Sequence, residues 1–312
     1  MRHGVPGRRG FRKMAAWLEK LKEGAAFPVL AGEPSAARAS YRAGGPFEAL
    51  ALPGSADELS GLLRLASSLG VPVTVLGAMT NVLVGDRGLP GLALSTAGLR
   101  GLAVEGTTLR LAAGEPWDNA VRAACEAGLE GLERTSGIPG TVGGAVRMNA
   151  GAYGQETFDT FESAEVADGA GERRVLMRGD LRWSYRSVPG LAGLTVLSAT
   201  FKLARAGAEG LEAERARILA ARAAGQPLDL PSAGSVFRRP QGDYASRLID
   251  ACGLKGLARG GAAVSEKHAG FIVNTGGATA ADIKGLMDEV RERVRERTGV
   301  ELCLEQVLLG DF

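Results

Sequence analysis

The feature that most restricts the fold of this chain is the glycine-rich run SGIPGTVGGAVRMNAGAYG, Ser136–Gly154, which contains six glycines and one proline. Glycine loses more conformational freedom on folding than any other residue, so such a run is expected where the backbone needs positive φ angles or close approach to another group. The spacing from Gly137 onward, G-x-x-G-x-x-G-G, differs from the G-x-G-x-x-G of a dinucleotide-binding Rossmann turn. Backbone N–H groups in such a run suit an anion, but tight turns between strands explain the pattern equally well.

Length and charge limit the class of protein. A chain of 312 residues is long enough for two or three packed units. A hydrophobic content of 45% and a charged content of 23% are typical of a globular protein. The net charge of +2 gives no basic excess for nucleic acid, so we expect a small-molecule ligand and no nucleic-acid partner.

The cysteine and histidine content excludes several kinds of site. Cys125, Cys252 and Cys303 are odd in number and lack CxxC spacing, so neither a disulfide framework nor a zinc site is predicted, and a reducing cytoplasm fits best. His3 and His268 are the only histidines, which excludes a multi-histidine metal site. No Gly-Lys pair occurs, so a Walker A loop is absent. We expect no bound metal.

The N-terminal residues carry no targeting or membrane signal. The basic start, MRHGVPGRRGFRK, continues into AAWLEKLKEG without the apolar run of a signal peptide. No segment approaches the length of uninterrupted apolar sequence that a membrane span needs. We expect residues 1–23 to be an N-terminal tail, loose at its start, with Met14 as an alternative start of translation.

Hydrophobic periodicity divides the remaining residues into three units. Residues 24–90 contain a strand at 47–53, a helix at 55–70 capped by Ser55, and a strand at 71–76, which together predict a small β-α-β lobe. Residues 91–205 change to short strands broken by glycine, a helix at 116–128, a hairpin around Asp168–Gly171 and a strand at 194–205. This second lobe is predicted to be α+β.

Residues 206–312 form the third unit. A strongly helical stretch at 209–225 is predicted to link it to the second lobe. Thr279, with Asp282 three positions on, has the pattern of a capping box. The predicted elements of this unit are a helix at 245–253, a strand at 271–274, a helix opened by Thr279, and a half-buried strand at 300–310.

Several segments resemble a known family, the UDP-N-acetylenolpyruvoylglucosamine reductases of bacterial peptidoglycan synthesis. The glycine run resembles the flavin-binding loop of that family. Further blocks recur in the family's order from Tyr41 to Gly310: YRAGGP, VTVLGAMTNVLVG, SYRS, PSAGSVF, VSEKHAGFIVN and VELCLEQV. PSAGSVF and VSEKHAGFIVN are far more specific than any glycine pattern. The short run after SYRS is similar to the shorter, second type of the family.

The resemblance implies a fold and a reaction. The fold is an α+β FAD-binding fold of the vanillyl-alcohol-oxidase-like (PCMH) kind in two lobes, with a C-terminal α+β substrate-binding domain. NADPH would reduce a non-covalent FAD, which would pass a hydride to C3 of the enolpyruvyl group of a UDP-sugar while an acid protonates C2. The implied protein is a cytoplasmic monomer that serves cell-wall synthesis, and thereby cell shape and division.

The resemblance also implies individual site residues. Ser235 matches the family's proton donor, Arg186 the arginine that stabilises the substrate carboxylate and enolate, and Glu305 a glutamate that tunes Arg186 or joins the proton relay. Arg147, Arg239 and His268 are the expected substrate contacts. The expected FAD contacts are Arg42, Gly77, Thr80, Asn81, Ser136, Gly137, Ile138, Gly140, Thr141, Gly143, Gly144 and Asn149.

Without the resemblance, these residues have ordinary structural interpretations. Ser235 reads as a turn hydroxyl beside Gly234, Arg186 as one of 37 basic residues, and Glu305 as an exposed strand carboxylate. His268 reads equally well as a satisfied, partly buried histidine, and Asn149 as support for its own turn.

Several positions depart from the family pattern. Arg38 and Ala39 replace the usual Asn-Thr, and Leu304 replaces a common proline. Met79 replaces the second glycine of the phosphate loop, where we expect its side chain to crowd an approaching anion. Arg239 replaces a substrate-contacting asparagine.

These departures motivate two alternatives. Arg239 motivates another FAD-linked oxidoreductase of the same fold, acting on a different sugar or hydroxy acid. Met79 motivates a non-catalytic relative that binds a nucleotide sugar.

Overall fold

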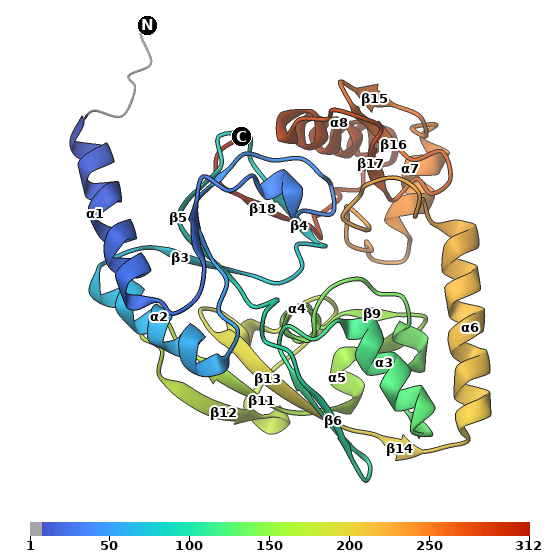
Figure 1. Cartoon of the computed structure of the whole chain (residues 1–312). Helices are drawn as coiled ribbons and strands as arrows, with labels where there is room; N and C mark the ends of the chain where they lie inside the picture. Colours follow the sequence, from blue (N-terminus) through green and yellow to red (C-terminus); the bar gives the residue numbers. More distant parts are fainter. Residues whose placement is uncertain (1–7) are drawn as a thin grey trace, which may run out of the picture.

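The computed structural model describes residues 8–312 and shows two lobes and a C-terminal domain (Figure 1). The helices are α1 (Arg8–Gly24), α2 (Ala56–Ser68), α3 (Trp117–Glu126), α4 (Val142–Met148), α5 (Thr157–Thr160), α6 (Ala208–Gly225), α7 (Ala245–Ala251) and α8 (Ala280–Thr298), with 3-10 turns η1 (Ser35–Ala37), η2 (Glu133–Thr135), η3 (Arg178–Asp180) and η4 (Pro189–Leu191). The strands are β1 (Val29–Ala31), β2 (Phe47–Ala51), β3 (Val73–Leu76), β4 (Val82–Val84), β5 (Leu89–Ser95), β6 (Leu102–Glu105), β7 (Thr108–Ala112), β8 (Leu129–Glu130), β9 (Gly151–Ala152), β10 (Gln155–Glu156), β11 (Phe161–Ala167), β12 (Arg173–Met177), β13 (Thr195–Lys202), β14 (Ala204–Arg205), β15 (Ala258–Arg259), β16 (Ala262–Val264), β17 (Ile272–Asn274) and β18 (Val307–Leu309).

The first lobe is a four-stranded sheet in the order β1-β2-β5-β3, in which β2, β5 and β3 run parallel. The predicted β-α-β unit is present: Ser55 caps α2, its hydroxyl accepting the Glu58 N–H, and α2 buries Leu59, Leu62, Leu63 and Ala66. The sheet needs β5, which runs across residues 90 and 91, where the sequence places the boundary between lobes.

The N-terminal segment differs from the expected tail. Residues 8–24 form the helix α1, which stands beside α2 at the edge of the molecule (Figure 1). Leu18 and Leu21 are buried in the same core cluster as Leu59 and Leu62 of α2. Because these leucines remove apolar surface from water, their packing against α2 stabilises the helix. The start of the expected tail, residues 1–7, lies outside the described residues.

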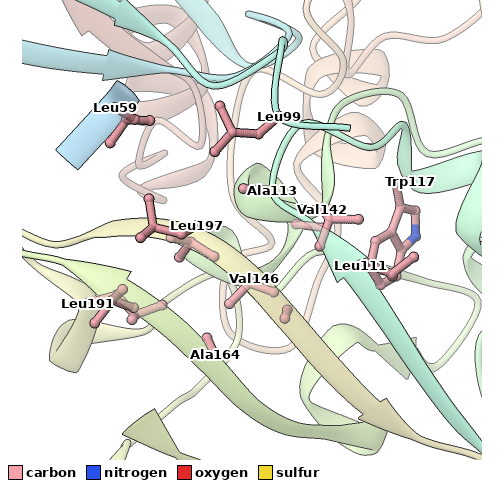
Figure 2. Packing of buried hydrophobic residues seen from close by; sticks show 14 of the residues in the cluster. Leu59, Leu99, Leu111, Ala113, Trp117, Val142, Val146, Ala164, Leu191 and Leu197 are labelled. Carbon is pink, nitrogen blue, oxygen red and sulfur yellow. The ribbon is translucent and has the colours of Figure 1, made fainter. Parts of the chain in front are cut away.

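The second lobe is a five-stranded antiparallel sheet in the order β12-β11-β13-β7-β6. The predicted hairpin is present, since β11 pairs with β12 and the Gly171 N–H donates to the Asp168 carbonyl. β13, at the predicted strand 194–205, lies in the middle of the sheet. Trp117 of α3 and Val142 and Val146 of α4 pack near Leu111 and Leu197 of this sheet in the main core (Figure 2).

The long helix α6 leads from the second lobe to the C-terminal domain along one side of the molecule (Figure 1). In that domain the sheet β15-β16-β17 and the helices α7 and α8 enclose a separate core that includes Leu248, Ile283 and Leu286. The predicted capping box at Thr279 is present, with both reciprocal hydrogen bonds to Asp282 formed. In the described chain, no helix combines the length and apolarity required to cross a membrane.

The segment 300–310 joins the C-terminal domain to the first lobe. Its burial alternates as predicted for a half-buried strand, but only Val307–Leu309 form regular strand, β18, which pairs in parallel with β4. Residues 303–305 instead make isolated contacts with residues 236–238, such as the bridge between Phe237 and Leu304. The C-terminal segment therefore lies against residues 236–238 and against β4 of the first lobe.

A second link between these parts involves Asp86, in the loop after β4. Its two carboxylate oxygens accept the N–H groups of Ala280 and Ala281, each at 2.8 Å, at the first turn of α8. The N–H groups at a helix start have no partner within the helix, so Asp86 stabilises α8 while holding it against the first lobe.

We predict that Asp86→Ala lowers the free energy of unfolding by about 1 kcal/mol, because it removes a capping carboxylate. Chemical denaturation followed by circular dichroism measures the change. The matched control is Asp288→Ala, which removes an exposed carboxylate of α8 paired with Lys284 and should cost less than about 0.5 kcal/mol. Equal losses in the two variants would contradict the tethering role.

Candidate active site

A half-buried ion pair between Arg186 and Glu305 lies where the second lobe meets the C-terminal segment. Arg186 Nε donates to Glu305 Oε1 at 2.9 Å, and the two side chains are only 17% and 15% exposed. The same guanidinium donates through Nη2 to the Gly151 carbonyl at 2.6 Å and through Nη1 to the Asn149 carbonyl at 3.3 Å. Arg186 is therefore fixed from two directions rather than solvated on the surface.

The local backbone presents Arg186 in a tight turn. Ser184 and Ser187 form an isolated antiparallel bridge, and Arg186 between them has φ +56°. The Arg186 guanidinium carbon lies 4.8 Å from the centre of the Tyr185 ring, a cation–π distance. A non-glycine residue in the left-handed region is strained. The hydrogen bonds of the Arg186 side chain therefore stabilise a backbone conformation that is otherwise unfavourable.

Positive φ angles outside glycine concentrate in the segments of the family resemblance. In residues 8–312 the non-glycine residues with positive φ are Arg42, Met79, Asn149, Tyr153 and Arg186. Each lies in YRAGGP, the LGAMTN loop, the glycine run or SYRS. Strain of this kind collects at binding and catalytic sites, so these segments are candidates for a functional site.

Ser235 is exposed, and its segment lies against the backbone of Glu305. Its segment is held between two others: Ser235 bridges Phe271, and the Val236 carbonyl accepts the Glu305 N–H at 2.9 Å. The Glu305 N–H therefore bonds to the residue that follows Ser235. Since Arg186 pairs with Glu305, the structure connects all three predicted catalytic residues.

The LGAMTN loop and the glycine run are in direct contact. Thr80 Oγ1 donates to the Pro139 carbonyl at 3.2 Å. A Cβ on Gly140, which has φ +125°, would lie 2.9 Å from Thr80 Oγ1, so this contact needs glycine for both space and conformation. A Cβ on Gly77 would lie 2.7 Å from Thr141 Oγ1. Among residues 8–312, no protein acceptor takes the backbone N–H of Ala78, Met79, Thr80, Gly140 or Thr141.

The second part of the glycine run is a helix rather than a loop. Thr141 caps α4, and its hydroxyl accepts the Gly144 N–H at 3.4 Å. The Gly143 N–H donates to the Ala113 carbonyl at 2.8 Å. A Cβ on Gly143 would lie 3.1 Å from the Ala113 Cβ, so glycine allows α4 to approach β7 closely. Of the predicted FAD contacts, Gly143 and Gly144 therefore have N–H groups already engaged.

The first part of the glycine run is fixed by α3 and α6. The Gly137 N–H donates to Asp118 Oδ1 at 2.7 Å, and Arg215 of α6 donates to Asp118 Oδ2 at 2.5 Å. The Ser136 and Ile138 N–H groups donate to the carbonyls of residues 133 and 135. The N–H groups of these three predicted cofactor residues are therefore engaged within the protein, and their hydrogen bonds fix the start of the glycine run.

Met79 does not occupy the place we expected from the sequence. Its side chain is buried, 5% exposed, in an apolar cluster with Leu50, Leu76 and Val84. The backbone adopts φ +53°, the conformation that glycine would supply. The methionine therefore points into the lobe and leaves its N–H unengaged, and the expectation that it crowds an approaching anion is wrong.

Two predicted cofactor residues form hydrogen bonds within the protein. Asn149 is fully buried and ends α4 in the left-handed conformation; its amide donates to Glu156 and to the Ser184 carbonyl, and its oxygen accepts the Phe158 N–H. Asn81 donates through Nδ2 to the Glu305 carbonyl at 3.1 Å. Asn149 thus holds the Arg186 turn, and Asn81 holds the backbone of Glu305.

The remaining predicted contacts are spread around the same region. Arg42 is exposed, and Arg147 is exposed with Nη1 donating to the Val188 carbonyl at 3.3 Å. The Arg239 guanidinium lies 4.3 Å from the centre of the Tyr244 ring, and both side chains are exposed. His268 Nδ1 accepts the Gly270 N–H at 3.1 Å, and burial lowers the pKa of this imidazole. His268 is therefore neutral near pH 7.

The structure adds residues that the sequence did not single out. Asp118 and Arg215 hold the glycine run, and Tyr41 and Gln306 form a buried hydrogen bond close to Ser235. The only sequence signal for Tyr41 and Gln306 is their position inside the blocks YRAGGP and VELCLEQV. For Asp118 and Arg215 we find no such signal, because their contacts join separate helices.

Known proteins resemble this chain over most of its length. Residues 47–176 match the model of an FAD binding domain, and residues 226–309 match that of the UDP-N-acetylenolpyruvoylglucosamine reductase C-terminal domain. The chain is 42% identical over 294 residues to the UDP-N-acetylenolpyruvoylglucosamine reductase of Caldanaerobacter subterraneus subsp. tengcongensis, which covers 94% of this chain and 96% of that protein. The corresponding protein of Methylorubrum populi is 43% identical over 272 residues, 86% of this chain and 88% of its own length.

A solved structure agrees with these relatives. The crystal structure of UDP-N-acetylenolpyruvylglucosamine reductase (MurB) from Thermus caldophilus matches with a TM-score of 0.77 and 33% identity, covering 91% of this chain and 98% of that one. The predicted fold class, an FAD-binding fold followed by a C-terminal domain, is confirmed.

Because Met79 has a positive φ, we expect glycine to be tolerated at this position at least as well as alanine. Met79→Ala should lower the free energy of unfolding by about 2 kcal/mol or more, because it empties a buried site. Met79→Gly removes more atoms but relieves a left-handed conformation that costs a side-chain-bearing residue about 1–2 kcal/mol. We predict that the glycine variant is at least as stable as the alanine variant in urea denaturation.

The control is the same pair of substitutions at Met287, which is 1% exposed within the helix α8. There, glycine should be less stable than alanine by about 1 kcal/mol. The Met79 prediction fails if both positions show the same order.

Proposed function

The chain belongs to the UDP-N-acetylenolpyruvoylglucosamine reductase family, and from that premise we propose that Arg186, Ser235 and Glu305 are its catalytic residues. The reaction converts UDP-N-acetylglucosamine enolpyruvate to UDP-N-acetylmuramate, with FAD as cofactor and NADPH as reductant. The observation that carries the assignment is the half-buried Arg186–Glu305 pair beside the exposed Ser235. The chain belongs to this family and keeps all three residues. Neither alternative is therefore favoured, whether an FAD-linked oxidoreductase with another substrate or a non-catalytic binder of a nucleotide sugar.

The unengaged amides fit the cofactor. The pyrophosphate of FAD is an anion, and N–H groups of Ala78, Met79, Thr80, Gly140 and Thr141 have no protein acceptor in the described chain. They come from two loops in contact through Thr80 and Pro139, so they are grouped rather than scattered. Backbone donors bind phosphate oxygens without a cationic side chain. When bound, the flavin supplies the hydride for C3 of the substrate.

Arg186 is suited to stabilise negative charge on the substrate. A guanidinium has five N–H donors, and three are used by Glu305, Gly151 and Asn149. The remaining two are available to the substrate carboxylate and to the charge that develops on it as C3 accepts the hydride. Glu305 keeps the cation in place and balances its charge when no substrate is bound.

Ser235 is the proposed proton donor to C2. A serine hydroxyl is a weak acid, so it transfers a proton only to a strongly basic carbon held at close range. Its exposed position, on backbone fixed at Val236, supports this role. The proton lost from Ser235 is replaced from solvent, directly or through Glu305.

The remaining predicted contacts are assigned to the substrate. We propose that Arg239 and Arg147, both exposed cations, bind the diphosphate or sugar, and that neutral His268 donates a hydrogen bond through Nε2. The finer setting is also a proposal: a cytoplasmic monomer whose product enters peptidoglycan synthesis and so affects cell shape and division.

The test of the function separates the two half-reactions. We predict that Ser235→Ala leaves flavin reduction by NADPH nearly unchanged but slows reoxidation by the enolpyruvyl substrate about 100-fold or more, the usual range for removing a proton donor. Anaerobic stopped-flow absorbance of the flavin measures both steps. Ser232→Ala is the matched control, because Ser232 lies in the same PSAGS segment, and it should change neither rate by more than about twofold.

Two outcomes would contradict the proposal. A colourless protein that takes up no FAD would exclude the enzyme function. A flavin that NADPH bleaches, but that the wild-type protein does not reoxidise with the enolpyruvyl substrate, would favour a different substrate.

A second prediction concerns the support of the glycine run. Asp118→Ala removes a charge-assisted hydrogen bond from Gly137 and should raise the FAD dissociation constant about tenfold or more, as measured by fluorescence titration of the apoprotein. Asp118→Asn should have a smaller effect, because its amide oxygen still accepts the Gly137 N–H.

The matched control for this prediction is Glu126→Ala, which removes another arginine-paired carboxylate from α3, far along the helix from Gly137. It should leave FAD affinity unchanged. If Asp118→Ala and Glu126→Ala behave alike, Asp118 does not order the loop.

A further inference from the structure

A buried chain of hydrogen bonds lies directly behind Ser235. Gln306 Nε2 donates to the carbonyls of Ala233 at 3.0 Å and Gly234 at 3.1 Å, the two residues that precede Ser235. Gln306 Oε1 accepts the Tyr41 hydroxyl proton at 2.9 Å. Tyr41 is completely buried and Gln306 is 4% exposed, so water does not compete for these bonds.

The chemistry of the groups allows one orientation of the Gln306 amide. Two carbonyl oxygens accept only, so they must face the NH₂ group, and the amide oxygen must face the Tyr41 hydroxyl. Burial raises the pKa of the Tyr41 phenol, so this hydroxyl stays protonated and remains a donor. In this orientation the Tyr41 hydroxyl and both ends of the Gln306 amide have partners. A reversed amide would place its oxygen against the carbonyl oxygens of Ala233 and Gly234.

These bonds fix the backbone on the near side of Ser235. Gly234 has φ +75°, a conformation that the pinned carbonyls at 233 and 234 help to maintain. On the far side, the Val236 N–H donates to the Gly270 carbonyl, and the Val236 carbonyl accepts the Glu305 N–H. The Ser235 Cα is thus held from both directions, which leaves rotation of its own side chain as the main freedom.

The chain also joins separate parts of the fold. Tyr41 belongs to the first lobe and precedes the positive-φ residue Arg42, whereas Gln306 follows Glu305. The Tyr41 carbonyl accepts from Asn274 Nδ2 at 2.9 Å in the C-terminal domain. A displacement of Tyr41 would therefore be transmitted to the backbone that carries Ser235 and to the residue next to Glu305.

We propose that Tyr41 and Gln306 are positioning residues that align the Ser235 hydroxyl with C2 of the substrate during proton transfer. This inference rests on the proposed role of Ser235 as proton donor. Neither residue touches the substrate in this account; both act through the backbone at Ala233 and Gly234. A purely structural role would instead lower stability and affect both half-reactions together.

The experiment uses the FAD-loaded protein with Tyr41→Phe and Gln306→Leu. Anaerobic stopped-flow absorbance gives the rate of flavin reduction by NADPH and of reoxidation by the enolpyruvyl substrate, in H₂O and in D₂O. We expect reduction to change less than about twofold and reoxidation to slow about 10- to 100-fold in Gln306→Leu, the range for a small misplacement of reacting groups. The solvent isotope effect on reoxidation should rise, because the misaligned proton transfer becomes more rate-limiting.

Tyr41→Phe keeps the aromatic ring and removes only the hydroxyl, so it tests the inference even if Gln306→Leu fails to fold. It should give a smaller change of the same kind. The double variant should be no slower than Gln306→Leu, because the two residues act through one chain of bonds. Thr298→Val is the control: it removes a hydroxyl that donates to the Val294 carbonyl within α8 and has no hydrogen bond to the Tyr41–Gln306 chain, so it should leave the isotope effect at the wild-type value.

The outcomes separate this inference from the function it depends on. If Ser235→Ala leaves reoxidation unchanged, the proposed proton donor is wrong. If Ser235→Ala slows reoxidation but Gln306→Leu and Tyr41→Phe keep the wild-type rate and isotope effect, the positioning role is overturned. Parallel losses in both half-reactions, with no rise of the isotope effect above the value of Thr298→Val, would also overturn it.

Discussion

The Arg186–Glu305 ion pair is the interaction on which the site depends. A half-buried guanidinium without a carboxylate partner is unfavourable, so the pair is stable only when the C-terminal segment lies against the second lobe. Asn81 holds the Glu305 backbone, the Asn149 carbonyl accepts from the guanidinium, and Asp86 fixes α8 to the first lobe. Two residues expected to touch the cofactor, Asn81 and Asn149, thus make bonds that keep the ion pair assembled.

Charge is arranged differently around the two halves of the site. The loops that suit a pyrophosphate present backbone amides, while the charged pair Asp118–Arg215 stays behind Gly137 and is internally neutralised. These backbone N–H dipoles are already oriented, so binding of an anion would require little reorganisation of the loops. At the proposed catalytic residues, by contrast, the formal charges of Arg186 and Glu305 are paired with each other.

The sequence predicts most clearly what depends on nearby residues. The caps at Ser55 and Thr279 and the hairpin at Asp168–Gly171 are local, and they form as expected. Helix α4 could not be predicted because glycines disfavour a helix. The need for Gly143 there comes from its close approach to Ala113, a contact that the local sequence does not show. The direction of the Met79 side chain could not be predicted for a related reason: it depends on a positive φ, which methionine rarely adopts.

The family resemblance located Arg186, Ser235 and Glu305, but the contacts that surround them join distant positions. Tyr41 and Gln306 are separated by 265 residues, and no periodicity or spacing links them.

The parallel pairing of β4 with β18 has a consequence for how the protein is made. Val82 pairs with Val307, and β4 has no other strand partner among the described residues. During translation, β4 leaves the ribosome long before β18, so its hydrogen-bonding edge stays unsatisfied while the intervening chain is synthesised. The nascent first lobe is thus exposed to aggregation until the segment carrying Glu305 has emerged. Formation of the Arg186–Glu305 pair and protection of that edge therefore wait for the same segment of the chain.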